Sequence, residues 1–340
     1  MQRRAAILLL FGVCAAFSNI GCAYSPLPTP FQPNSNAPFL LVLGIAQDGG
    51  VPQTGSGPAA GIGGGAGHQD LIFQRLRAPE PAFRRLVVSL AVVDPQSRER
   101  WLFEATPDIK EQLFRLDIWA PVPGPAPRLN GIFLTHAHMG HYTGLAQFGH
   151  EALGAKDLPV YAMPRMASFL SSSGPWDQLV RLGNIKLKLL DDGKPVQLNQ
   201  RLSVTPLRVP HRQEYSEVVG FIIEGPEKRV LFIPDIDSWE ELDAQGTRIE
   251  DLIASVDVAY LDATFYADGE IPGRDMSGFP HPFITNSMRR FAKLPMSERA
   301  KVRFIHLNHT NPALLPGSKA RQAIERAGLK VAEEMERVEL

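Results

Sequence analysis

Short apolar runs recur along most of the chain, separated by polar, glycine-rich and proline-containing stretches. The runs cover residues 39–46, 85–94, 100–106, 131–136, 159–164 and 185–190 in the first half, and residues 202–211, 218–225, 229–235, 256–264 and 301–309 in the second. Each run is rich in Val, Ile, Leu and Phe, as buried β-strands are. Several runs follow one another directly, so the pattern predicts two sheets packed together rather than a regular alternation of strands and helices.

Helical patterns lie between some of the strands. Apolar residues recur at helical spacing in residues 107–116, and similar patterns cover residues 144–154, 284–294 and 318–328. We expect these helices to cover the outer faces of the two sheets. The prediction is therefore one α+β domain over residues 39–340.

The first 23 residues have a basic start and an apolar run instead of the strand pattern. A short basic start at Gln2-Arg3-Arg4 precedes an apolar run from Ala5 to Phe17, which is too short to span a membrane. This pattern predicts a signal peptide over residues 1–23. Gly21-Cys22 resembles the lipobox of bacterial lipoproteins, in which the cysteine is acylated, and ordinary cleavage after Ala23 is the alternative. We expect an exported protein, either periplasmic or anchored to the membrane through Cys22.

Two low-complexity segments follow. Residues 24–38 are rich in proline, serine and asparagine, which is typical of a linker. Residues 49–67 are rich in glycine and form either a surface insertion or a loop beside an active site. The two cysteines, Cys14 and Cys22, both precede the linker, so neither disulfides nor thiolate ligands are expected in the domain.

The charge balance narrows the possible partners. The chain has 35 Lys and Arg against 36 Asp and Glu, a net charge of −1, and no basic block. Nucleic acid is therefore not an expected partner, and a small-molecule substrate is. The pattern does not predict the oligomeric state.

The stretch GIFLTHAHMGHYTGL carries the strongest chemical signal. It places His136, His138 and His141 within six residues, directly after an apolar run. Neutral imidazole is the commonest protein ligand for zinc, so the cluster predicts a metal site. Other candidate ligands follow later strands, whose ends lie close together when they share one edge of a sandwich. These candidates are His211, Asp235, Asp237, His306 and His309.

The order of these histidines and aspartates along the chain resembles that of the metal ligands in the metallo-β-lactamase superfamily. The resemblance runs through Asp108, residues 136–141, His211, Asp235 and His309. The segments LGIAQDGGVPQTG, EATPDI, THAHMGHYTGL and HLNHTNP resemble the branch of that superfamily that contains coenzyme PQQ synthesis protein B. The resemblance implies an αββα sandwich with the site at one edge of the two sheets.

The resemblance also implies the ligand sets. His136, His138 and His211 would hold one metal, His141 and His309 a second, and Asp235 would bridge them. The expected cofactor is Zn2+, one or two per chain, with iron as an alternative. Asp235 would also act in catalysis, as the acceptor of a proton from water.

One position departs from the superfamily. Gly140 stands where the superfamily has an aspartate that binds the second metal. A glycine offers no ligand, so we expect the second position to be weaker or empty and Gly140→Asp to strengthen it. Asp237 is not expected to compensate, because a side chain two residues beyond Asp235 points away from the site. Asp108 is expected to orient a loop or a ligand histidine.

Three further residues carry weaker expectations. Strand alternation would place His306 on the face opposite His309, in packing rather than in the site. His281 lies in a loop, where it would either reach the substrate or cap a turn. Asp262 ends a strand, where it could accept a hydrogen bond from a ligand histidine.

Together these features predict a metal-dependent hydrolase in which the metal activates a water molecule. The substrate would be a small ester, amide, lactone, thioester or phosphodiester. Two alternatives remain open. One is metal-dependent oxygen chemistry, for example with iron, on a quinone-type precursor, as in PQQ biosynthesis. The other is a non-catalytic protein that uses the metal cage to bind a ligand.

Overall fold

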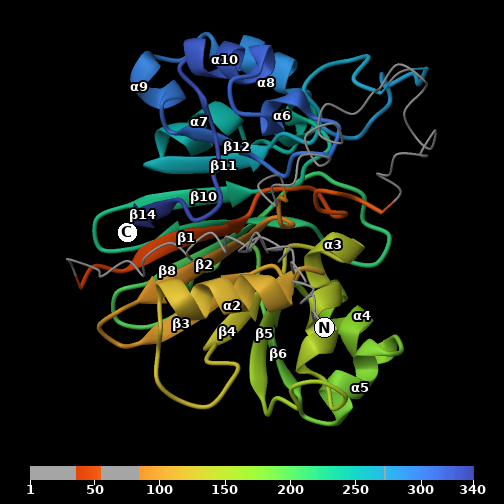
Figure 1. The fold of residues 1–340 in the computed structure, drawn as a ribbon, viewed down its shortest axis with the longest axis vertical. Helices are drawn as coiled ribbons and strands as arrows, with labels where there is room; N and C mark the ends of the chain where they lie inside the picture. Colours follow the sequence, from red (N-terminus) through yellow and green to blue (C-terminus); the bar gives the residue numbers. More distant parts are fainter. Residues whose placement is uncertain (1–35, 55–83, 272) are drawn as a thin grey trace, which may run out of the picture.

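The structure is a computed structural model that describes residues 36–54, 84–271 and 273–340. In these residues the chain forms two mixed β-sheets that lie face to face, with helices on both outer faces (Figure 1). The predicted αββα sandwich is therefore confirmed. The predicted signal peptide, most of the predicted linker and the glycine-rich segment from residue 55 onward lie outside the described residues.

The first sheet is built mainly from the first half of the chain, with one strand from the C-terminus. In spatial order its strands are β14 (Arg337–Glu339), β1 (Phe39–Gly44), β2 (Ser89–Asp94), β3 (Glu99–Phe103), β4 (Gly131–Phe133), β5 (Leu158–Ala162) and β6 (Ile185–Leu189). β1, β2 and β3 pair antiparallel, whereas β3 to β6 run parallel.

The second sheet comes from the second half of the chain. Its strands, again in spatial order, are β13 (Lys330–Val331), β12 (Val302–Ile305), β11 (Val258–Asp262), β10 (Arg229–Ile233), β9 (Val219–Glu224), β8 (Ser203–Arg208) and β7 (Val196–Gln197). β10 to β13 run parallel, and β7 to β10 pair antiparallel.

The helices form two separate outer layers. Those near the first sheet are α2 (Ile109–Trp119), α3 (Met139–Tyr142), the 3-10 helix η2 (Thr143–Phe148), α4 (Pro164–Ser172) and α5 (Trp176–Arg181). Those near the second sheet are α6 (Trp239–Ala244), α7 (Ile249–Ala254), α8 (Ile284–Phe291), α9 (Met296–Arg299), the 3-10 helix η3 (Pro312–Leu314) and α10 (Lys319–Arg326).

The predicted helices agree with this arrangement except over residues 144–154. There the structure has only the short 3-10 helix η2, followed by turns. Among the described residues, no helix is long and apolar enough to cross a membrane.

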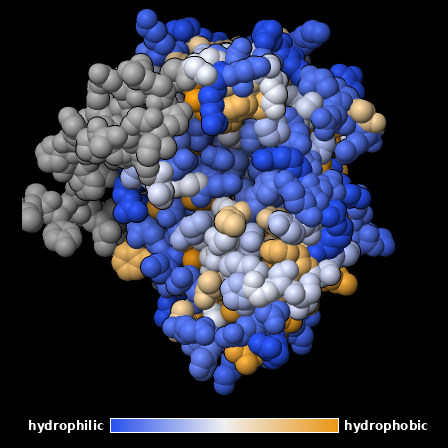
Figure 2. Space-filling model, turned by 90° about the vertical axis from the view of Figure 1, so that its right-hand side faces the viewer, coloured by the Kyte–Doolittle hydropathy of each residue, from blue (hydrophilic) through white to orange (hydrophobic). Residues whose placement is uncertain are grey.

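The core between the sheets is centred on aromatic side chains from both. Phe103 and Phe133 of the first sheet stack with their ring centroids 5.1 Å apart. Phe221 of the second sheet packs edge-on against both of them, at 5.5 and 5.7 Å, and Phe232 lies 6.4 Å from Phe103. A second apolar cluster fills the space between the first sheet and its outer helices. The surface in Figure 2 is mostly hydrophilic, with apolar side chains in small separate groups.

Candidate metal centre

The site lies where several strands of both sheets end. In the first sheet, β1 and β3 run in the same direction because both pair antiparallel with β2, and β4 is parallel to β3. In the second sheet, β8 and β10 share a direction because both pair antiparallel with β9, and β11 and β12 are parallel to β10. The residues that follow these strands therefore meet at one edge of the sandwich.

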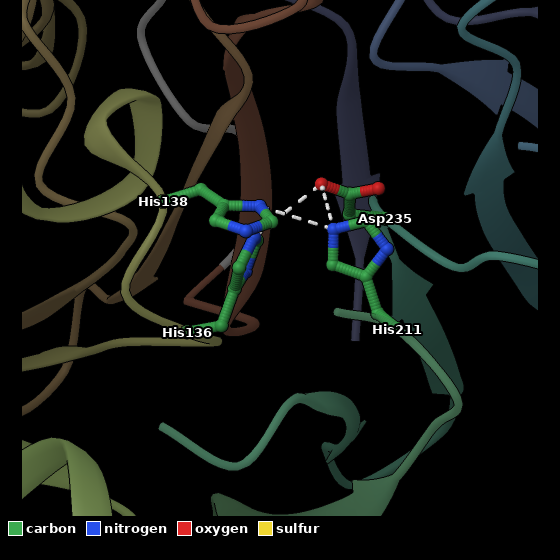
Figure 3. Close-up of side chains that lie close together, drawn as sticks. All are labelled: His136, His138, His211 and Asp235. Atoms are coloured by element: carbon green, nitrogen blue, oxygen red, sulfur yellow. Dashed lines mark hydrogen bonds and ion pairs between the residues drawn. The ribbon is translucent and has the colours of Figure 1, made fainter. Parts of the chain in front are cut away.

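One cluster brings together three of the predicted histidine ligands and the predicted bridging aspartate. His136 and His138 follow β4, His211 follows β8 and Asp235 follows β10, and their side chains converge (Figure 3). One ligand atom of each lies within 4.8 Å of the others. His211 Nε2 is 3.1 Å from His138 Nδ1 and 3.1 Å from Asp235 Oδ2.

Asp235 Oδ2 is the central atom of the site. Besides His211 Nε2, it faces Nε2 of His136 at 3.4 Å, of His141 at 3.7 Å and of His306 at 4.0 Å. Four imidazoles thus point one nitrogen each at the same carboxylate oxygen. A carboxylate in that position can be shared between two adjacent cations, which is the role that the resemblance implies for Asp235.

A second cluster adjoins the first. Asp48, in the turn after β1, lies with its Oδ1 3.1 Å from His141 Nε2 and 3.4 Å from His306 Nε2. Both histidines are fully buried, and the Asp48 side chain is 34% exposed. The predicted ligand His141 is therefore in the site. Its neighbours there are Asp48, which is not among the predicted ligands, and His306, which is expected in packing.

The prediction that His306 packs outside the site is wrong. The predicted ligand His309 is not part of any ligand cluster among the described residues. β12 ends at Ile305, and His306 has a φ of 64°, so the chain leaves the extended conformation directly before the imidazole. Strand alternation no longer applies there, and His306 turns into the site. His309 lies in the following turn, with its Nδ1 3.0 Å from Asn308 Oδ1.

Carboxylates around the clusters contact either the histidine nitrogens that face away from the site or a nearby loop. Asp237 Oδ1 lies 2.6 Å from His211 Nδ1, so Asp237 orients a ligand rather than compensating for Gly140. Glu104, buried after β3, has its Oε1 3.6 Å from His141 Nδ1. Asp108 accepts a hydrogen bond from the Val87 backbone N–H, which confirms its expected role in orienting a loop.

Asp262 organises the opposite side of the site. Its Oδ2 accepts a hydrogen bond from the Ile236 backbone N–H and lies 2.9 Å from His281 Nδ1. Its Oδ1 accepts hydrogen bonds from Thr264 N–H and Oγ1–H, and Thr264 Oγ1 also lies 2.9 Å from His306 Nδ1. Because its carboxylate is saturated in this way, Asp262 positions the neighbouring histidines. His281 Nδ1 is also 3.3 Å from Asp235 Oδ1, so His281 is part of the site.

Asp48 and Glu104 were missed, although the sequence contained a signal for each. Asp48 follows the apolar run 39–46, and Glu104 follows Phe103, the last in a row of apolar positions within the run 100–106. The rule that strand ends meet at one edge, applied to the first sheet as it was to the second, selects both positions.

Burial and neighbouring charges shift the pKa of several site residues. Burial, and then the neighbouring His141, lower the pKa of His136 well below its ordinary value, so this imidazole is neutral and able to bind a cation. Burial opposes protonation of His211, but the carboxylates of Asp235 and Asp237 raise its pKa to about 9. Burial would raise the pKa of Asp235, and the surrounding histidines instead hold it well below its ordinary value.

The donor atoms fit a bound cation. His136 Nε2, His141 Nε2 and Asp235 Oδ1 are buried and form no hydrogen bond among the described residues. Buried polar atoms without a partner are rare in folded proteins, and each calls for an explanation such as an ion. Imidazole nitrogens and carboxylate oxygens are suitable ligands for zinc or iron.

Comparisons with known proteins show which family the chain resembles. The sequence model of the β-lactamase superfamily domain matches residues 99–330. The chain is 27% identical over 320 residues to coenzyme PQQ synthesis protein B of Methylobacterium sp. (strain 4-46), covering 86% of this chain and 96% of that protein. The corresponding protein of Gluconacetobacter diazotrophicus is 24% identical over 326 residues, covering 86% of this chain and 96% of that protein.

Two solved structures share the fold. One is Zn2+-bound PqqB from Methylobacterium extorquens, with a TM-score of 0.70 and 23% identity over 89% of this chain and 100% of that one. The other is a diphosphatase of the PhnP family, with a TM-score of 0.60 and 20% identity over 89% of this chain and 97% of that one.

Proposed function

The chain belongs to the β-lactamase superfamily domain family, and from this premise we propose that it is a metal-dependent hydrolase with zinc as its cofactor and a small molecule as its substrate. The bond that it cleaves would belong to an ester, amide, lactone, thioester or phosphodiester. The observation that carries the proposal is the convergence of four imidazole nitrogens on Asp235 Oδ2, with buried donor atoms that have no hydrogen bond among the described residues.

Each residue of the site would have a separate role in metal binding or catalysis. His136, His138 and His211 would hold the cation together with Asp235. A bound cation would supply a water of lowered pKa and polarise an oxygen of the substrate. Asp235 would accept the proton of that water at its carboxylate. Asp237 would keep the His211 ring in the orientation that presents Nε2 to the site.

A second candidate function is a step in the synthesis of coenzyme PQQ. The observation that favours it is the similarity over 86% of this chain to coenzyme PQQ synthesis protein B. In this reading the site would bind iron and carry out oxygen chemistry on a quinone-type precursor. The two candidates differ in the metal and in the co-reactant, because only the second consumes oxygen.

The test uses the purified full chain after chelation and reloading with zinc, or anaerobically with iron. Hydrolysis is measured on a chromogenic carboxylic ester, a lactone, an amide and a phosphodiester, and oxygen consumption is followed with a quinone precursor. We expect zinc-dependent hydrolysis of at least one class, lowered by more than about 100-fold in His211→Ala. His150→Ala is the matched control, because His150 is an exposed histidine outside the clusters.

Hydrolysis that is independent of metal, or equal in His211→Ala and His150→Ala, would contradict the hydrolase proposal. Iron-dependent oxygen consumption without hydrolysis would replace it with the second candidate.

A further inference from the structure

Position 140 has no room for a side chain, because Asp48 fills that space. A Cβ atom added to Gly140 would overlap the Asp48 carboxylate and lie 2.5 Å from the Asp48 Cα. Real Cβ atoms are essentially never found that close to another heavy atom. Gly140 and Asp48 are therefore complementary: the glycine leaves a space, and a carboxylate from another part of the chain enters it.

The turn that carries Asp48 is fixed to the site by backbone hydrogen bonds. The Gly50 N–H donates to the Gln47 carbonyl at 2.7 Å, which closes the turn around Asp48. The Gln47 N–H donates to the Leu307 carbonyl, and the Leu307 N–H donates to the Ile45 carbonyl, both at 2.9 Å. These bonds join the extension of β1 to the segment that carries His306. Asp48 is thus held beside its histidine partners before any ligand arrives.

The contacts of Asp48 have the character of an incomplete ligand set. Its Oδ1 lies 3.1 Å from His141 Nε2, yet His141 Nε2 is buried and makes no hydrogen bond among the described residues. The two atoms are close but poorly aligned with each other, as ligands directed at a common ion are. Behind the ring, the buried carboxylate of Glu104 faces His141 Nδ1, as the outer carboxylates of metal-binding histidines do.

The resemblance to the superfamily implies a second metal position beside the first. We propose that in this chain Asp48, His141 and His306, with Asp235 shared, are the residues that hold a divalent transition-metal cation at that position. The carboxylate of this second position comes from the turn after β1 instead of from residue 140. The cation would enter from the side of Asp48, whose side chain is 34% exposed while both histidines are fully buried. This inference deepens the proposed function and rests on its first metal position.

The structure changes the result expected for Gly140→Asp. From the sequence alone, this substitution is expected to strengthen metal binding at the second position. With Asp48 in place, the new side chain would instead overlap an existing carboxylate, so the single variant should lose zinc and stability. The double variant Asp48→Gly with Gly140→Asp moves the carboxylate back to residue 140 and removes the overlap.

The experiment measures zinc per chain by elemental mass spectrometry, after the full chain has been loaded with zinc alone and dialysed. We expect about two zinc ions in the unaltered chain, about one in Asp48→Asn, and about two again in the double variant. Asp48→Asn is nearly isosteric and keeps the turn, so misfolding should not obscure its result. Asp251→Asn, at an exposed position on α7, is the matched control and should keep the full content.

The outcomes separate this inference from the proposed function. Equal zinc content in Asp48→Asn and the unaltered chain, whether one ion or two, would overturn the inference and leave the hydrolase proposal standing. A zinc ion lost in Asp48→Asn, in a chain that hydrolyses nothing, would support the inference and count against the hydrolase. No zinc in the unaltered chain would overturn both.

Discussion

At the scale of single residues, the site depends on which nitrogen each histidine presents. His136 Nδ1 lies 2.8 Å from Thr135 Oγ1, His211 Nδ1 faces Asp237 and His306 Nδ1 faces Thr264, so all three rings direct Nε2 inward. His138 is the exception, since its Nε2 faces Glu214 at 3.1 Å and its Nδ1 points into the cluster. Partners behind the rings thus fix the direction of the ligand atoms.

Glu104 should increase the affinity for metal although its carboxylate contacts the ligand His141 and does not face the metal position. It is fully buried, with a φ of 74°, and its carboxylate raises the pKa of His141 well above the ordinary value against the opposing effect of burial. Glu104→Gln keeps the shape and removes the charge, so we expect zinc affinity at the second position to fall by about 10-fold or more. Competition with a chromogenic chelator measures this affinity.

Glu227→Gln is the control for this variant, because Glu227 is exposed in the turn between β9 and β10. Unchanged affinity in Glu104→Gln would show that the buried carboxylate serves the fold alone.

His281 should act on the substrate rather than hold metal. Its Nδ1 is occupied by Asp262 and Thr264, which leaves Nε2 without a hydrogen bond among the described residues. In His281→Ala we expect kcat to fall by about 100-fold while zinc content stays the same. Steady-state kinetics and elemental analysis of the same sample make this measurement, and a loss of zinc in parallel with kcat would refute the assignment.

The structure places together five residues that could be selected from the sequence as candidate ligands, because a dense histidine motif and strand ends are local features. They are His136, His138, His141, His211 and Asp235. The sequence was not sufficient for His306, whose place depends on a left-handed backbone turn directly after β12. Asp48 posed a different difficulty. Its role arises from a space at Gly140, which becomes visible only when two distant segments are seen together.

At the scale of elements, the strands were easier to predict than the helices. Every predicted apolar run overlaps a strand, because buried strands need continuous apolar residues. The short strands β7, β13 and β14 and the short helices α5, α6 and α7 carry too few residues for a periodic pattern. The helix predicted over residues 144–154 reduces to η2, because the Gly149 backbone turns to a ψ of 173° directly after Phe148.

The docking of α3 and η2 on the end of β3 should control the position of His141. The Ala105 N–H donates to the His141 carbonyl at 2.9 Å, and the Gly144 N–H donates to the Ala105 carbonyl at 2.8 Å. A Cβ at Gly144 would overlap the Thr106 carbonyl oxygen and lie 2.8 Å from the Ala105 carbonyl oxygen. Gly144→Ala should therefore push the histidine segment outward, with a loss of about 1–3 kcal/mol in unfolding free energy.

Urea unfolding and zinc content measure the two effects in Gly144→Ala. Gly278→Ala is the control, since a Cβ there would meet no atom within 4 Å. Equal stability and zinc content in the two variants would mean that this contact does not position His141.

At the scale of the whole molecule, the metal centre joins the two sheets. His136 and His138 come from the end of β4 in the first sheet, whereas His211 and Asp235 come from the ends of β8 and β10 in the second. The Val219 N–H also donates to the Thr135 carbonyl at 3.2 Å, which links β9 to the histidine loop. The ion pair of Arg201, just before β8, with Asp94 of β2 is a further polar link between the sheets, and apolar packing joins the rest of their facing surfaces.

Removal of the metal should therefore lower the stability of the whole domain. A ligand that binds only the folded chain stabilises it by about 2.7 kcal/mol when present at 100 times its dissociation constant. For a chain of this size we expect a chelator to lower the melting temperature by about 5 °C or more. Scanning calorimetry of the zinc-loaded and the chelator-treated chain measures this change in melting temperature. Elemental analysis confirms that the treated sample has lost its zinc.

The size of the chelator effect should depend on which ligand is removed, and this dependence identifies which of the two cations contributes more to the stability of the fold. In His211→Ala the first position loses its ligand from β8, so the melting temperature should start low and respond little to the chelator. In Asp48→Asn the ligands of the first position are intact, so most of the chelator effect should remain. If the chelator effect were the same in His211→Ala as in the unaltered chain, the stabilising cation would not be the one at the first position. Its stabilising effect would then have to be sought at the second position.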